Sequence, residues 1–264
     1  MKFTTKINQV IILIFLSSNL LLGQTEKNKI KIIYSYHVPN NGKMSDERYS
    51  YLIADNQSSF FVTQRNDFPK PENKVTQDAN NISIKVFDAD DIGSYVFRDF
   101  EKDSIIFREV GSKFMNAIIV TDKWEKIMWE IIDENKNIGE YTCKKAIGKF
   151  RGRNYTAWFT EDIPIPSGPW KLYGLPGIIL EAYDSNMEFY AVVKELKINY
   201  ESSEEITALT NNKENKYNFE EYKLYRKNYK ETYINSIKAK LPRGANLNLK
   251  PSDIKLSPIE SEIE

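Results

Sequence analysis

The chain has 264 residues with 37 basic and 37 acidic side chains, so its formal net charge is zero at neutral pH. Nucleic-acid binding requires a basic surface, and this balanced composition gives no excess of basic residues to form one, so we expect no nucleic-acid partner. A single cysteine excludes an intramolecular disulfide, so stability must come from the packing of a core, which a chain of this length is able to bury.

Residues 1–23 have the build of a secretory signal peptide. Lys2 and Lys6 precede an apolar stretch that ends at Leu22, and Gly23 is the small residue that follows it. The stretch is shorter and more interrupted than the roughly 20 apolar residues that span a bilayer, so cleavage is favoured over an uncleaved anchor. We therefore expect a periplasmic or secreted protein with no transmembrane segment after signal cleavage.

Short runs of β-branched and aromatic residues follow, separated by polar breaks and without long helical stretches between them. This spacing predicts an antiparallel meander. The polar stretches 65–81 and 201–216 are interpreted as loops, and a turn is predicted at 134–137. The predicted strands are 30–37, 48–54, 59–64, 82–88, 94–99, 104–110, 114–121, 127–133, 139–150, 153–160, 178–184 and 187–200.

One helix is predicted near the C-terminus, from Phe219 to Leu241. Asn218 can cap it together with Glu221, and an aromatic stripe then recurs at spacings of three and four. The stripe, which we expect to pack on the sheet, consists of Tyr222, Tyr225, Tyr229, Tyr233 and Ile237.

These patterns predict one domain over residues 24–242 and a polar, extended or disordered tail over 243–264. The predicted fold is mainly β or α+β, with a curved antiparallel sheet of about ten strands and one C-terminal helix packed on it. A sheet of that size tends to curl, and a half-barrel is considered by analogy.

Few residues suggest catalysis or metal binding. His37 is the sole histidine, and no nucleophile motif accompanies it, so we interpret it as a strand-end residue. One histidine and one cysteine cannot complete a zinc site, and no cofactor is expected. The cluster Asp88, Asp90 and Asp91 only partly resembles a calcium loop and is interpreted as turn acids.

Cys143 lies inside a predicted strand, between Thr142 and Lys144. A lone cysteine in such a place is usually a small buried hydrophobe, and we favour that interpretation. The alternative is a reactive thiol whose pKa the neighbouring lysines lower.

The most distinctive stretch is rich in glycine and proline and spans 167–181. Proline fixes φ and glycine permits conformations closed to other residues, so this stretch predicts two rigid turns beside Trp170 and Tyr173. The predicted turn residues are Gly168, Pro169, Gly174 and Gly177. The residues expected to form a ligand or partner surface are Trp158, Trp170, Tyr173 and Pro176. The alternative is that these aromatic side chains cap the core.

The segment 174–179 reads Gly-Leu-Pro-Gly-Ile-Ile and resembles the signature of the GLPGLI family of exported bacterial proteins, with Ile178 where that name has Leu. The stretches 138–146, 150–153 and 157–160 are similar to the family pattern too, and the resemblance covers about 124–196. It implies a signal-bearing, exported protein. It supplies no established activity and no catalytic residues.

Two functions stay open at this level. The first is a non-enzymatic envelope protein that binds an apolar ligand or a protein partner around Trp158, Trp170 and Tyr173. The alternative is a periplasmic hydrolase that uses acidic residues. A concave apolar cavity would favour the first, and two inward-facing carboxylates with raised pKa would favour the second.

Overall fold

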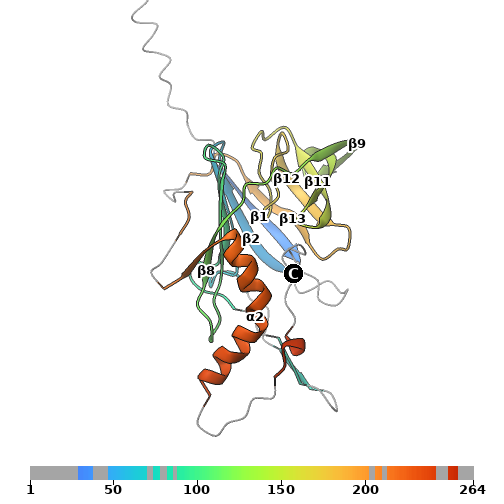
Figure 1. Cartoon of the computed structure of the whole chain (residues 1–264). Helices are drawn as coiled ribbons and strands as arrows, with labels where there is room; N and C mark the ends of the chain where they lie inside the picture. Colours follow the sequence, from blue (N-terminus) through green and yellow to red (C-terminus); the bar gives the residue numbers. More distant parts are fainter. Residues whose placement is uncertain are drawn as a thin grey trace, which may run out of the picture.

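The fold is mainly β: one open sheet of 12 strands with a single C-terminal helix, α2 (Phe219–Ala239), packed on it (Figure 1). This confirms the predicted fold class. The predicted signal peptide lies outside the residues that the structure, a computed structural model, describes. Those residues are 29–37, 47–69, 74–77, 82–85, 88–201, 206–209, 213–241 and 249–254.

The strands of the large sheet follow the order β14-β8-β7-β6-β3-β2-β1-β13-β12-β11-β10-β9, and β4 and β5 form a separate hairpin. All neighbours in the large sheet are antiparallel except β14 and β8, which are parallel. The strands are β1 (Ile30–His37), β2 (Arg48–Ala54), β3 (Ser58–Thr63), β4 (Lys74–Gln77), β5 (Ile82–Lys85), β6 (Ser94–Asp99), β7 (Ser104–Glu109), β8 (Ile118–Asp122), β9 (Trp129–Ile138), β10 (Tyr141–Phe150), β11 (Arg153–Thr160), β12 (Ile178–Asp184), β13 (Tyr190–Lys197) and β14 (Asn215–Asn218).

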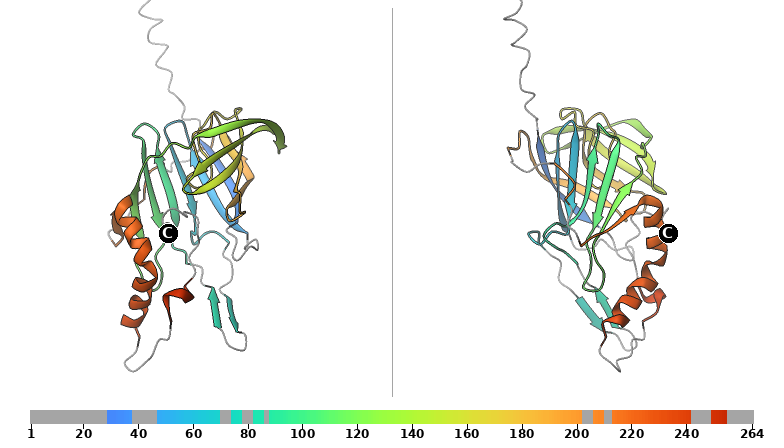
Figure 2. Two further views of the ribbon diagram at one scale, coloured as in Figure 1. Left: turned by 45° about the vertical axis from the view of Figure 1, so that its right-hand side comes forward. Right: turned by 60° about the vertical axis from the view of Figure 1, so that its left-hand side comes forward.

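The sheet is strongly curved, and its half from β9 to β13 turns away from the half from β2 to β8 (Figure 2). The pairing register shifts between Ile33 and Tyr34 in β1, Lys144 and Lys145 in β10, and Trp158 and Phe159 in β11. An extra residue in one strand of a pair bends that strand and increases its twist. These irregularities therefore help to give the sheet a concave inner face.

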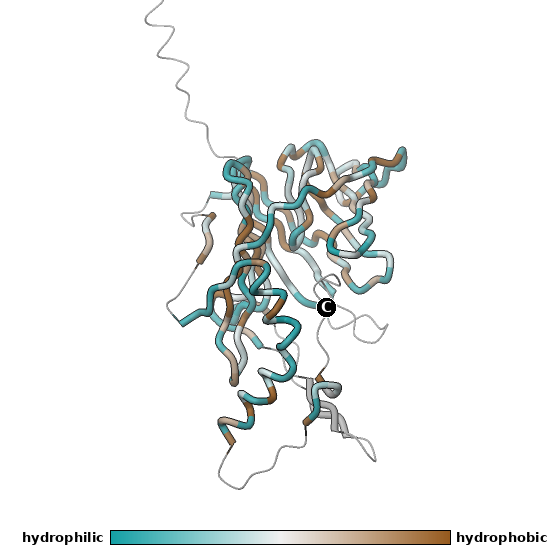
Figure 3. The backbone as a smooth tube through the Cα atoms, viewed as in Figure 1, coloured by the Kyte–Doolittle hydropathy of each residue, from teal (hydrophilic) through white to brown (hydrophobic). Residues whose placement is uncertain are grey.

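Apolar residues recur along the strands (Figure 3) and form two clusters, which lie on opposite faces of β1, β2, β3, β6 and β7. β3 shows the alternation: Phe61 packs in the larger, inner cluster, whereas Phe60 and Val62 pack in the outer one. Because both faces of β2 and β3 are buried, each strand carries a continuous apolar run, over residues 51–54 and 60–62.

Helix α2 begins with the predicted capping box. The Asn218 side chain accepts a hydrogen bond from the Glu221 N–H, and the Glu221 carboxylate accepts one from the Asn218 N–H. Neighbouring tyrosine rings of the predicted stripe contact one another along the helix, and the Tyr222 ring lies 4.9 Å from that of Phe107 in β7. The helix ends at Ala239, two residues before the predicted end.

Several predicted boundaries are wrong. The turn expected at 134–137 is strand, because β9 continues to Ile138 and the chain reverses at Gly139, which has a φ of 59°. Residues 111–117 form a loop, so β8 is shorter than predicted. Two strands were missed, β4 and β14, and within the tail expected to be extended η1 (Pro251–Asp253) is a turn of 3-10 helix. Among the described residues, no helix is long and apolar enough to cross a membrane.

Candidate functional site

A recess of about 340 Å³ lies at the end of the sheet where β1, β3 and β7 finish and β2 and β6 begin, and the glycine-rich connection before β12 and helix α2 contribute to its lining. Strand alternation directs Phe61 of β3 and Phe107 of β7 toward it, and Trp170 and Tyr222 add rings from the connection and the helix. Its apolar and aromatic lining consists of Tyr36, Tyr49, Phe61, Phe68, Pro69, Tyr95, Val96, Phe107, Val110, Trp170 and Tyr222.

The Trp170 indole is fixed on three sides. Its ring lies 5.9 Å from Phe150, 6.2 Å from Tyr155 and 5.9 Å from Phe189, and the residue is 9% exposed. Its φ is +54°, in the left-handed region that bulky side chains rarely adopt. Such a conformation costs roughly 1–3 kcal/mol and persists only where the surroundings impose it. Trp170 is thus held rigidly at the wall of the recess.

Two glycines shape the connection for different reasons. Gly174 has a φ of +91° and open space around it, so it is needed for its backbone conformation. At Gly177, a Cβ would lie 1.9 Å from the Thr160 carbonyl oxygen, so glycine is needed for the close approach of the chain to the end of β11. Gly168 packs in the same manner against the Ile179 side chain. Gly174 and Gly177 thus constrain the path of the connection.

The predicted ligand surface is not assembled as one unit. Trp170 lines the recess, but Trp158 points to the other face of β11, where the Lys136 ammonium lies 4.3 Å from its ring centre. Tyr173 is buried with its ring 4.6 Å from the Arg98 guanidinium, and Pro176 is exposed. The structure thus separates these four side chains, and Tyr173 caps the core.

A cluster of buried charges lies behind Trp170. The Asp122 carboxylate accepts from Arg151 at 2.8 Å and from the Lys171 ammonium at 2.7 Å, and all three side chains are buried. Arg98, 1% exposed, donates to the Ser59 hydroxyl at 3.3 Å and to the Trp170 carbonyl at 3.5 Å. Burial lowers the pKa of Arg98 to about 10, which expresses the cost of holding its charge there.

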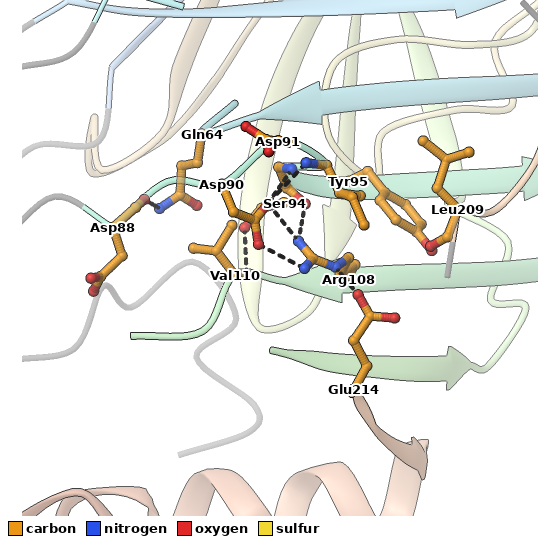
Figure 4. Close-up of polar contacts among 12 residues, drawn as sticks. Gln64, Asp88, Asp90, Asp91, Ser94, Tyr95, Arg108, Val110, Leu209 and Glu214 are labelled. Atoms are coloured by element: carbon orange, nitrogen blue, oxygen red, sulfur yellow. Dashed lines mark hydrogen bonds and ion pairs between the residues drawn. The ribbon is translucent and has the colours of Figure 1, made fainter. Parts of the chain in front are cut away.

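A second charged group borders the recess from the outer face of β7 (Figure 4). Arg108 forms two hydrogen bonds with Asp90, at 2.7 and 3.1 Å, one with Glu214 at 2.5 Å and one with the Gly93 carbonyl at 2.7 Å. The predicted aspartate cluster is therefore structural at Asp90, which also accepts from the N–H groups of Ile92 and Gly93. No group of three or more potential metal ligands occurs among the described residues.

Two carboxylates of the described part of the chain, those of Asp88 and Glu109, line the recess. Burial raises the pKa of Asp88, whereas Glu109 accepts a hydrogen bond from the Tyr222 hydroxyl. A paired-carboxylate hydrolase needs two acids whose environments separate their pKa values, and Asp88 supplies one acid of that kind.

The remaining candidates are structural. Cys143 is fully buried, as predicted, and burial raises the pKa of its thiol to about 11. The thiolate is the nucleophile, so this pKa argues against the reactive-thiol alternative. His37 ends β1, partly exposed, with its ring 5.9 Å from that of Tyr190, as expected of a strand-end residue.

Comparison with known proteins gives one family match. A family described as a protein of unknown function (Porph_ging) matches residues 149–181, which include the glycine-rich connection. A search of curated protein sequences finds no match.

Solved structures give remote likenesses. PNGF-II, in two crystal forms, is 14% and 15% identical, with TM-scores of 0.48 and 0.47 over 79% of this chain. This chain spans about a third of the length of PNGF-II, 34% and 33% in the two forms. An uncharacterized conserved protein from Thermus thermophilus is 9% identical, with a TM-score of 0.39, and the match covers 76% of this chain and 99% of that one. None of these likenesses bears on function.

Sequence reasoning missed most of the recess and its surrounding charges. Arg98 carried a usable signal, because it lies two residues after Val96 on the inward-facing side of an apolar strand. Arg108 shares the outer face of β7 with Ile106 in the same way. A charge at such a position indicates an internal polar network. Arg48 and Arg226 carried no comparable signal.

Proposed function

We propose that the protein is a non-enzymatic binding protein of the bacterial envelope and holds an apolar small molecule in the recess beside Trp170. The observation that carries this proposal is the aromatic lining of a preformed concavity of about 340 Å³. Ligand sites are typically concave, mostly apolar and about 300–1,000 Å³ in volume. The recess is concave and has a volume in this range, and its described lining combines 11 apolar or aromatic residues with 9 polar or charged ones.

The fixed indole favours binding over catalysis. A rigid aromatic side chain loses little conformational entropy when a ligand packs on it, so more of the contact energy contributes to affinity. Trp170 carries a costly backbone conformation and three ring contacts that hold it in place. Strain of this kind clusters at ligand sites.

We also propose that the protein is exported and belongs to the GLPGLI family of exported bacterial proteins. The segment 174–179 and the family match over 149–181 support this assignment. The mature chain should then begin near Gln24. N-terminal sequencing of the protein from its native envelope tests the cleavage, and an intact Met1 there would contradict it.

Binding is tested with N-phenyl-1-naphthylamine, a neutral aromatic probe whose fluorescence rises in apolar surroundings. We expect saturable binding by the native protein and its loss in Thr63→Trp, because Thr63 lines the recess and a larger side chain would fill it. Thr121→Trp is the matched control, since Thr121 is exposed on β8 and does not line the recess.

Both variants are first checked for native stability by urea unfolding. If native protein fails to bind the probe, or if Thr63→Trp binds as well as Thr121→Trp, the proposed function is refuted.

A further inference from the structure

The large sheet is open, and β9 forms one of its two edges (Figures 1 and 2). A strand at an edge is paired on one side only, so the backbone N–H and C=O groups of its other side are available to another strand. Among the described residues, no strand pairs with that other side of β9. The strand therefore presents a row of backbone donors and acceptors at the margin of the sheet.

The first half of β9 is the regular part of this edge. Residues 129–132 pair with residues 145–148 of β10 without a break, whereas Asp133 and Glu134 are extra residues at the register shift. Proteins commonly protect an edge strand with proline, lysine or a bulge. Residues 129–132 contain neither proline nor lysine, so protection begins only at the bulge. We call residues 128–132 the edge site.

Exposed apolar side chains gather at the edge site. Met128 is 83% exposed and Ile131 51%, and Ile147 in the neighbouring β10 is 39% exposed. Ile147 lies opposite Glu130, whereas Ile131 lies opposite Ala146 on the other face of the sheet. An added strand would therefore find apolar contacts on both of its faces. The other large apolar side chains with comparable exposure in the described part of the chain each lie on a different segment: Met187, Ile198, Leu209 and Leu224.

The charges of β9 favour one kind of partner. Its acidic residues are Glu130, Asp133 and Glu134, and its one basic residue is Lys136. Glu134 and Lys136 already form ion pairs with residues of β10 and β12, at 2.9 and 2.8 Å. Glu130 and Asp133 are exposed, and neither forms an ion pair with a described residue. Two carboxylates of this strand therefore lack a counterion.

An added strand would lie about 4.8 Å from β9 and about twice as far from β10, so the side chains of β9 dominate its surroundings. Opposite charges on facing residues of adjacent strands stabilise their pairing, and like charges destabilise it. A second copy of β9 fits this edge poorly, because it brings the same carboxylates to it. A strand with basic residues compensates them.

We propose that the edge site binds an extended segment of another protein, in which basic and apolar residues alternate, as an added strand of the sheet. The backbone of β9 holds the segment, its basic side chains lie next to Glu130 and Asp133, and its apolar side chains pack on Ile131. No residue of β9 or β10 lines the recess beside Trp170. The inference therefore goes beyond the proposed function and does not depend on it.

The test uses two short fluorescein-labelled peptides and the native protein. Lysine and valine alternate in one peptide, and glutamate and valine alternate in the other. Fluorescence anisotropy should show saturable binding of the lysine peptide, roughly ten-fold tighter than binding of the glutamate peptide and weaker as salt is added.

Charge reversal then locates the bound peptide. The double variant Glu130→Lys/Asp133→Lys should reverse the preference, so that the glutamate peptide binds more tightly. Glu231→Lys is the matched control, because Glu231 is exposed on α2 and forms no ion pair with a described residue. It should bind both peptides as the native protein does. Urea unfolding first checks that these surface variants are folded.

Backbone methylation of the lysine peptide tests the strand pairing in the native protein. Successive residues of a strand direct their N–H groups to opposite sides, so methylation at alternate residues removes the N–H groups that face β9 in one peptide and spares them in the other. We expect one methylated peptide to bind as the parent does and the other to bind at least about ten-fold more weakly.

Several results would overturn the inference. They are absent or equal binding of the two charged peptides, an unchanged preference in the double variant, and equal binding of the two methylated peptides. Loss of the lysine peptide in Thr63→Trp would place it in the recess and would also overturn the inference. Self-association in analytical ultracentrifugation that the double variant abolishes would show that a second copy, not a basic partner, occupies this edge.

Discussion

Alanine substitutions in the glycine-rich connection should distinguish two reasons why a position requires glycine: a left-handed backbone conformation and a close approach of another chain segment. At Gly174 an added Cβ meets nothing within 4 Å, so Gly174→Ala introduces only the cost of a φ of +91°. That cost is about 1–2 kcal/mol. At Gly177 the added Cβ would lie 1.9 Å from the Thr160 carbonyl oxygen and 2.6 Å from its carbon. Both atoms are backbone, so no side-chain rotation can relieve the clash.

Ordinary approach of carbon to a carbonyl oxygen is about 3.3–3.6 Å, so Gly177→Ala must separate the connection from the end of β11 by more than about 1 Å. Overpacking usually costs about 1–3 kcal/mol, and we place this case at the upper end or beyond it because backbone must move. We therefore expect Gly177→Ala to lower the free energy of unfolding by about 3 kcal/mol or more.

Urea unfolding followed by circular dichroism measures the difference. With a slope of about 3 kcal/mol per M, the midpoint should fall by about 1 M for Gly177→Ala and by about half that or less for Gly174→Ala. Gly139→Ala is the control for left-handed φ without a steric contact, since Gly139 lies at φ +59° with nothing within 4 Å. Equal losses at Gly174 and Gly177, or a smaller loss at Gly177, would refute the close-approach argument.

Trp170→Ala should lower the free energy of unfolding by about 3–5 kcal/mol and weaken probe binding, and an unchanged unfolding curve would contradict its packing role. Cys143 should resist a maleimide at neutral pH until the protein is unfolded, because the thiol is buried and its pKa is about 11, and rapid labelling of native protein would refute this. Arg98→Met should leave the free energy of unfolding unchanged or raise it by about 1–4 kcal/mol. Arg108→Met should lower it by about 3–5 kcal/mol, because Asp90 and Glu214 lose their partner. A higher urea midpoint for Arg108→Met than for Arg98→Met would contradict these charge assignments. Asn218→Ala should cost about 1 kcal/mol through loss of the helix cap, as measured by thermal unfolding, and a cost of zero would contradict the capping role.

Local patterns predicted most strands because their residues alternate or are buried on both faces. Five strands, including β1 and β12, match their predicted bounds without a shift. β9 was misjudged because it is an edge strand exposed along most of its length, so polar residues such as Asn135 are compatible with strand and need no turn. β14 was missed because four polar residues become a strand only by pairing in parallel with β8.

The recess could not be predicted from local patterns. Phe61, Phe107 and Tyr222 are far apart in the sequence, and they meet because the sheet curves and α2 packs against its inner side. Trp170 was predicted to belong to a ligand surface because it lies between proline and glycine residues, which restrict the backbone locally. Its three ring partners depend on tertiary packing, which sequence spacing does not reveal.

The position of β1 in the sheet has a consequence for how the chain folds. In the large sheet, the strands from β2 to β8 pair with the strands next to them in sequence once the small β4–β5 hairpin is set aside, and so do β9 to β13. In contrast, β1 pairs with the distant strand β13, with Lys31 opposite Lys197. Closing so long a loop is entropically costly, and such distant pairings slow folding. The two halves of the sheet can thus form early, whereas β1 can pair with β13 only after most of the chain is present. If the chain is exported, as we propose, and crosses the membrane unfolded, β1 stays unpaired with its distant partner β13 until translocation is nearly complete.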